Sequence, residues 1–164
     1  MTAVVGVALA ALFTLLLGVL RLPHPPDLFL LPVASVSRRG RAIPAMFTGL
    51  LAGLTQDALT SPVRLLGLNA FSKVLLAYLM AAIGARALVE KPVMFGILAW
   101  AAVALDSLVL TGLVWVLRGE PLLPDLLSVT LRAAGTGVLA ALLQAAFRYP
   151  WKEARAARRR RKLA

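Results

Sequence analysis

The sequence predicts an all-α integral membrane protein, a compact bundle of five long transmembrane helices plus one short or broken membrane segment. The chain has 164 residues, of which 60% are hydrophobic and 15% charged, and its mean hydropathy is +0.86. Soluble globular domains carry about 25% charged residues. Because a membrane-spanning helix uses about 20 mostly apolar residues, several spans account for nearly the whole chain. No separate soluble domain is expected.

Five apolar runs are long enough to cross a bilayer: residues 3–20, 42–59, 68–85, 92–117 and 126–147. A sixth run, residues 27–37, would be about 16 Å long as a helix, against a hydrocarbon core of about 30 Å. It can be extended at one end, tilt under its neighbours, or form a half-helix inside the bundle, where irregular backbone is tolerated. We expect a single transmembrane domain, residues 1–147, followed by a basic tail, residues 148–164.

The distribution of Lys and Arg predicts the orientation, because short cytoplasmic loops accumulate positive charge. If all six segments cross and the C-terminus is cytoplasmic, 13 of the 18 Lys and Arg residues lie inside. Arg21, Arg64 and Arg118 then lie outside, and Lys73 and Arg132 lie within spans. This arrangement places both termini in the cytoplasm. If the short segment does not cross, the N-terminus lies outside instead.

The tail is strongly basic: eight Lys and Arg residues fall in the last 17 positions. Five of them are consecutive: Arg158, Arg159, Arg160, Arg161 and Lys162. Such a cluster beside a span fixes orientation and attracts anionic membrane lipids, at about 1 kcal/mol per charge. Nucleic-acid-binding proteins usually add aromatic or motif signals that are missing here, so no nucleic-acid partner is expected.

Four ionisable residues lie within the long spans: Asp57, Lys73, Asp106 and Arg132. Each costs about 2.5–3.5 kcal/mol to insert, so each is expected to face the bundle interior with a partner. Their depths along the spans predict two ion pairs, Asp57–Lys73 and Asp106–Arg132. With Asn69 they form a polar cluster. We favour ion pairs that hold helices together over a ligand or proton site.

Small residues one turn apart predict tight helix packing. Gly49 and Gly53 form one such pair, and Gly137 and Ala141 form another. Small residues at this spacing allow two helix backbones to approach closely in lipid. The pattern does not distinguish a contact inside the chain from a contact with a partner.

Several classes of chemistry lack the residues they need. The chain contains no cysteine and one histidine, which excludes disulfides, cysteine-type zinc sites and paired-histidine metal sites. No hydrolase elbow, glycine-rich phosphate loop or HExxH motif occurs in the sequence. We therefore expect no catalytic residues, no metal and no cofactor.

The stretch from Gly49 to Leu79 resembles MreD, the rod-shape-determining membrane protein family of bacteria. That family shows a glycine-rich span ending in an aspartate, a short Ser/Pro/Gly turn, and then Gly-Leu and a small residue opening the next helix. The matching positions here are Asp57, Ser61, Pro62, Gly67, Leu68, Asn69 and Ala70. The chain length, the proline-rich break after the first span, the short second segment and the basic tail also fit the family.

The resemblance implies a non-enzymatic component of the cell-elongation complex in the bacterial cytoplasmic (inner) membrane. It would bind MreC and through it support the RodA glycosyltransferase, its transpeptidase partner and the MreB filament in peptidoglycan synthesis. The family is also similar in plan to the substrate-binding subunits of energy-coupling vitamin transporters. A solute-binding subunit of a small-molecule transporter is therefore the alternative, with the polar cluster as its pocket.

Overall fold

The computed structural model describes residues 2–19, 25–60, 67–86, 91–119 and 125–163. These ranges contain only helices as regular elements. The helices are α1 (Thr2–Val19), α2 (Leu30–Ser37), α3 (Ala42–Thr60), α4 (Leu68–Arg86), α5 (Pro92–Arg118) and α6 (Leu126–Leu163).

The predicted class, a helical membrane protein, agrees with the length and composition of these helices. Three stretches are long and apolar enough to cross a membrane: Leu68–Ala85, Pro92–Leu117 and Leu126–Ala146. Ala3–Val19 adds a shorter apolar helix. Proline and glycine explain the two ends of α5. Pro92 occupies the first turn of this helix, and Gly119 ends it with a left-handed backbone, φ 72°.

The short segment forms a half-helix inside the bundle. Its helical part, α2, has eight residues, about 12 Å in length. Phe29, Leu30, Val33 and Ala34 are at most 1% exposed. Because irregular backbone is tolerated at membrane depth only where protein or water satisfies it, the non-helical residues before α2 need polar partners. The backbone N–H of Asp27 donates to Thr136 Oγ1 at 2.8 Å and supplies one such bond.

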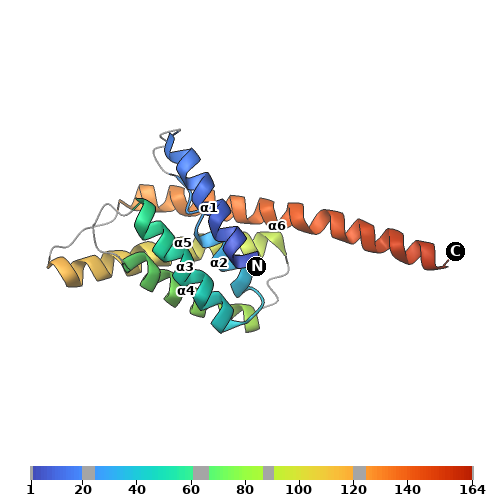
Figure 1. Ribbon diagram of the computed structural model, residues 1–164, viewed down its shortest axis with the longest axis horizontal. Coiled ribbons are helices and arrows are strands. Elements are labelled where there is room, and N and C mark those ends of the chain that lie inside the picture. Colours follow the sequence, from blue (N-terminus) through green and yellow to red (C-terminus); the bar gives the residue numbers. More distant parts are fainter. Residues whose placement is uncertain (1, 20–24, 61–66, 87–90, 120–124, 164) are drawn as a thin grey trace.

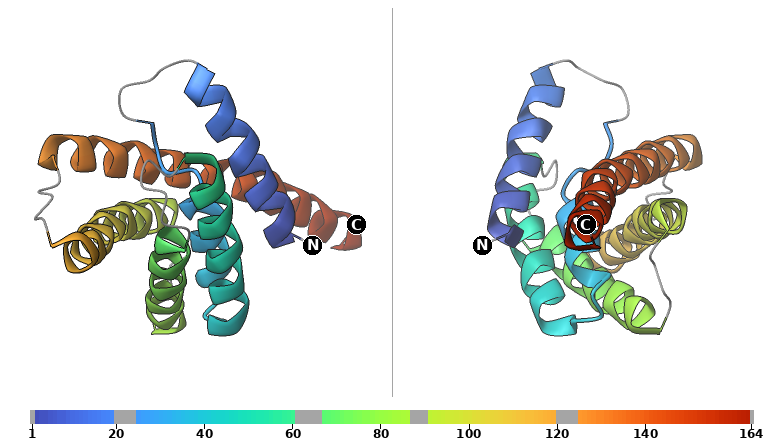
Figure 2. Two further views of the ribbon diagram at one scale, coloured as in Figure 1. Left: turned by 60° about the vertical axis from the view of Figure 1, so that its left-hand side comes forward. Right: turned by 90° about the vertical axis from the view of Figure 1, so that its right-hand side faces the viewer.

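Two helix pairs make up most of the bundle. Helix α3 packs along α4, and α5 packs along α6, and the second pair crosses the first at an angle (Figure 2). Helix α2 contacts α3, α4 and α5, whereas α1 packs on α2 and α3. The half-helix thus fills the space between the two pairs.

The small residues lie where the paired helices meet. A methyl group on Gly49 would lie 2.5 Å from the carbonyl oxygen of Lys73, and one on Gly53 would collide with the backbone of Ala70. On the other pair, a methyl group on Gly137 would lie 2.9 Å from the carbonyl oxygen of Gly96, and one on Gly96 would lie 3.0 Å from Ala141 Cβ. Both small-residue faces are therefore contacts inside the chain.

Helix α6 is much longer than a membrane span. It has 38 residues, about 57 Å, and its C-terminal part projects well beyond the other helices (Figure 1). The basic tail thus continues the last helix. The side chains from residue 147 onward, including Arg158–Lys162, lie outside the described part of the structure.

Candidate functional site

A buried lysine between two buried aspartates forms the polar centre of the bundle. Lys73 Nζ lies 2.9 Å from Asp27 Oδ2 and 3.3 Å from Asp106 Oδ2. Lys73 is 0% exposed, Asp27 4% and Asp106 5%. The three residues come from α4, the segment before α2, and α5. One ammonium group thus connects three separate parts of the fold.

Hydroxyl and amide groups complete this centre. Ser72 donates a hydrogen bond of 2.5 Å to Asp106 Oδ1, so both oxygens of that carboxylate have a partner. Asp27 Oδ1 accepts a bond of 3.0 Å from the backbone N–H of Phe29, while its Oδ2 faces the lysine. Burying a charge is tolerated when it is paired and its remaining lone pairs are used, and both carboxylates meet this condition.

Arg132 on α6 balances the charge of the centre. Its backbone carbonyl accepts a hydrogen bond of 2.8 Å from Thr136 Oγ1, the hydroxyl that also accepts the backbone N–H of Asp27. Two cations and two anions, Lys73, Arg132, Asp27 and Asp106, then sum to zero. The Nε atom of Arg132 is buried and has no hydrogen-bond partner among the described residues.

The two ion pairs predicted from the sequence are wrong. Lys73 binds Asp106 and Asp27 rather than Asp57, and Asp106 binds Lys73 and Ser72 rather than Arg132. The depth of a residue along its helix gives its level in the membrane but not the direction in which it points. Asp57 and Lys73 therefore lie toward the same end of the α3–α4 pair without facing each other.

Asp57 instead caps the start of α4. Its carboxylate accepts hydrogen bonds from the backbone N–H of Gly67 at 2.9 Å, of Asn69 at 3.3 Å and of Ala70 at 3.4 Å. The side-chain amide of Asn69 adds a bond of 2.8 Å. The first N–H groups of a helix have no partner within it, and its positive dipole end favours an anion. Asp57, at the end of α3, therefore fixes the position at which α4 begins.

The residues of the motif thus have separate roles. Gly67 adopts φ 104°, a conformation that favours glycine, at the point where the chain enters α4. Leu68 is the first residue of α4. Pro62 and Ser61 lie outside the described residues.

Sequence reasoning missed Asp27, Ser72 and Thr136. The signal for Asp27 was its position: it follows two prolines and opens an apolar run too short to cross a membrane. A half-helix must have polar groups beside its irregular end, and a carboxylate there can serve both as a local acceptor and as a counter-charge. Ser72 and Thr136 carried no comparable signal, because single hydroxyl residues are common in membrane helices.

The arrangement is suited to holding helices together. Lys73, Asp27 and Asp106 point toward one another and are buried. No group of three or more His, Cys, Asp or Glu residues suitable for a metal ion occurs among the described residues.

In comparisons with known proteins, no family model, no curated protein and no solved structure matches the chain.

Proposed function

We propose that this protein is a non-enzymatic scaffold subunit of the bacterial cell-elongation complex. It binds MreC within the cytoplasmic membrane and through it supports RodA, the transpeptidase partner of RodA and the MreB filament. The residues that resemble the MreD family, from Gly49 to Leu79, motivate this proposal.

One observation carries it: the described residues of the motif lie together where α4 begins. Asp57 receives the N–H groups of Gly67, Asn69 and Ala70, and Gly49 and Gly53 pack on the same helix that these residues open. A glycine-rich span, a terminal aspartate and a Gly-Leu helix start are therefore parts of one helical hairpin. These three features therefore have a structural reason to occur together in one sequence, and this supports the resemblance.

The polar centre argues against the alternative, a solute-binding transporter subunit. That function needs polar side chains free to bind a solute. Lys73 is occupied by Asp27 and Asp106, and Asn69 by Asp57. A scaffold needs such groups only to fix its own helices, while its outer surfaces bind partners.

The same proposal includes a topology of six crossings with both termini in the cytoplasm. The Arg38–Arg41 turn bears on the orientation of the bundle and not on the number of crossings: a methyl group on Gly40 would lie 3.0 Å from the Cα of Ala85, and one on Gly84 would lie 2.8 Å from the carbonyl oxygen of Ser37. This turn and the C-terminal end of α4 thus lie at the same end of the bundle. The positive-inside tendency assigns that end to the cytoplasm.

Co-purification tests the function. The tagged protein, solubilised from the membranes of its own rod-shaped cells in a mild detergent, should recover MreC. Depletion should make the cells round. An unrelated multi-pass protein with the same tag is the control. Normal rods after depletion, together with no MreC above the control, would reject the proposal.

A further inference from the structure

Arg132 on α6 is a cation within a membrane span whose hydrogen-bond donors the bundle does not use. Its Nε atom is buried and lacks a partner, and its side chain forms no hydrogen bond or ion pair with a described residue. A guanidinium group carries five N–H donors and no acceptor. Because no water replaces a missing bond in the hydrocarbon core, donors left unused there are costly. The position therefore calls for an acceptor that the described residues do not supply.

Two carboxylates near this part of α6 are engaged elsewhere. Asp27 lies beside the next turn of α6 and directs its carboxylate to Lys73, 2.9 Å away. Asp125, just before the first turn of α6, accepts a hydrogen bond of 2.7 Å from the Ser128 hydroxyl. The positive charge of Arg132 balances the polar centre, but its N–H groups need an acceptor within about 3 Å. Charge balance alone does not supply one.

The depth and direction of Arg132 bring its guanidinium toward one edge of the membrane. Arg132 follows Leu126, where the apolar stretch of α6 begins, by six residues, so its Cα lies about 9 Å inside that end. Helical side chains lean toward the helix N-terminus, and an arginine stem is long enough to carry its head toward the interface. The residue is half-buried, so part of it is accessible at the surface of the bundle.

The chain beside Arg132 is the non-helical segment before α2. Thr136 Oγ1 accepts the backbone N–H of Asp27 at 2.8 Å, and a methyl group on Gly135 would lie 3.7 Å from Pro26 Cβ. Residues three and four apart share one face of a helix, so Arg132 lies on this same face, one turn nearer the start of α6. Its side chain is therefore next to the polar centre, on the side toward the headgroups.

We infer that Arg132 binds the phosphate group of a membrane lipid whose acyl chains lie along α6. The planar guanidinium donates two parallel hydrogen bonds to phosphate oxygens, which supplies the missing acceptors. Lipid surrounds this helix, and its phosphates lie at the edge of the hydrocarbon core toward which the side chain leans. A phosphate dissolved in water offers the same acceptors but would have to leave water to reach this depth. The inference goes beyond the scaffold function and does not depend on it.

Native mass spectrometry of the full chain in detergent tests the ligand. The protein is incubated with phosphatidylglycerol, phosphatidylethanolamine or diacylglycerol of the same acyl chains, and retention of the first bound lipid is measured. Each phospholipid should be retained at least about tenfold more than diacylglycerol, the effect of hydrogen bonds between charged groups. Equal retention of all three lipids would overturn the inference. Displacement of the phospholipid by inorganic phosphate would assign the site to a soluble anion and overturn the choice of lipid.

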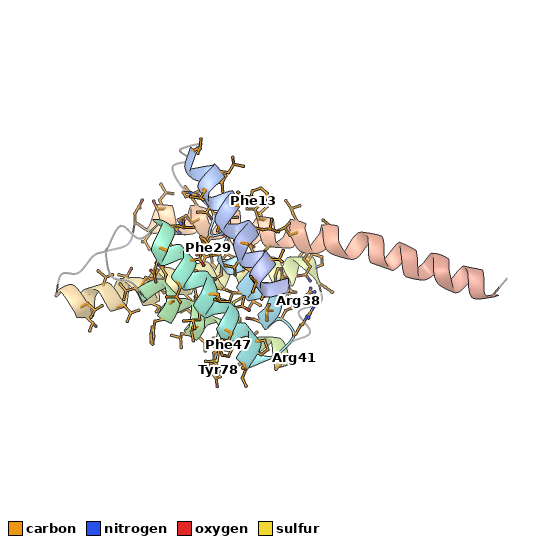
Figure 3. The ribbon with its side chains drawn as sticks, in the orientation of Figure 1. Phe13, Phe29, Arg38, Arg41, Phe47 and Tyr78 are labelled. Atoms are coloured by element: carbon orange, nitrogen blue, oxygen red, sulfur yellow. The ribbon has the colours of Figure 1, made fainter. Side chains whose placement is uncertain are left out.

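Variants of Arg132 test the residue. Arg132→Gln removes the charge and the planar fork and should lower phospholipid retention by about tenfold. Arg132→Lys keeps the charge without the fork and should lower retention by about threefold. The matched control is Arg41→Gln, because Arg41 is exposed at the turn before α3, at the end of the bundle opposite the start of α6 (Figure 3). This control should retain as much lipid as the unmodified protein.

Circular dichroism of each variant separates loss of the lipid from loss of the fold. A folded Arg132→Gln variant that retains as much phospholipid as Arg41→Gln would show that Arg132 only balances charge. If Arg132→Gln does not fold, Arg132→Lys and the comparison of phospholipid with diacylglycerol on the unmodified protein decide the question. Full retention by Arg132→Lys would then contradict the bidentate contact, and diacylglycerol retained as well as phospholipid would exclude the phosphate.

Discussion

Lys73 is the residue whose removal should cost the most. Its ammonium group has no exposure and two carboxylates depend on it. A buried ion pair contributes little when compared with apolar residues of similar volume, but breaking one leaves an uncompensated charge. The polar centre therefore favours one arrangement of α2, α4 and α5 by penalising every arrangement that separates its members.

Replacing Lys73 by Met should destabilise the protein by about 3–5 kcal/mol, because Asp27 and Asp106 would be left together without their counter-charge. Unfolding by SDS in mixed micelles, followed by circular dichroism, measures the loss. The triple variant Asp27→Asn, Lys73→Met, Asp106→Asn removes all three charges and should recover much of the stability. Equal damage in the single and triple variants would show that shape and not charge determines the effect.

Replacing Asp57 by Ala should cost less, about 0.5–2 kcal/mol, which is the usual range for a lost helix cap. Asp57→Asn should retain part of the cap, because its amide oxygen still accepts from the N–H groups of α4. The same unfolding assay compares the two. Restored stability in a double exchange, Asp57→Lys with Lys73→Asp, would contradict the cap and indicate an ion pair between them.

At the scale of the elements, the sequence predicted most helix positions. The predicted spans begin and end at proline, glycine or charged residues, which mark the edges of the apolar runs. Three of these spans agree within a residue or two with α3, α4 and α5: residues 42–59, 68–85 and 92–117. The ion pairs could not be predicted in the same way. Pairing depends on the rotation of each helix about its axis, and the weak amphipathicity of membrane spans leaves that rotation undetermined. Asp27 lies just before the half-helix, in the short segment. A search for ionisable residues within the long spans therefore does not include it.

The glycines of α3 set the distance between α3 and α4. Gly53→Ala should destabilise the protein by about 1–3 kcal/mol, as over-packing does, because the added methyl group meets the backbone of Ala70 and not a flexible side chain. Gly112→Ala in α5 is the control. No atom lies within 4 Å of the position its methyl group would take, so the substitution should be neutral or stabilising by up to about 1 kcal/mol. SDS unfolding of both variants tests the contact, and similar values for the two would exclude it.

At the scale of the whole molecule, the question is whether the half-helix crosses the bilayer. Helix α2 contributes about 12 Å, the turn at Leu28 and Phe29 adds about 3 Å, and residues 25–27 add at most about 10 Å. Their sum, about 25 Å, is shorter than the hydrocarbon thickness of about 30 Å. The segment can therefore cross only if the residues before it supply the remaining length, and if its irregular part is satisfied by protein. Thr136 and the polar centre supply such partners next to Asp27.

The chain has no cysteine, so single cysteines report topology without background. Thr2→Cys, Arg39→Cys and Arg159→Cys should react with a membrane-impermeant maleimide only after the cytoplasmic membrane is permeabilised, whereas Arg64→Cys should react in intact spheroplasts. Thr2 is the decisive position, because Arg39 and Arg159 are separated by four helices and share a side whether or not the half-helix crosses. Labelling of Thr2→Cys from outside would mean that the segment enters and leaves by the same face. The Asp27–Lys73 bond would then hold a re-entrant loop in place of a sixth crossing.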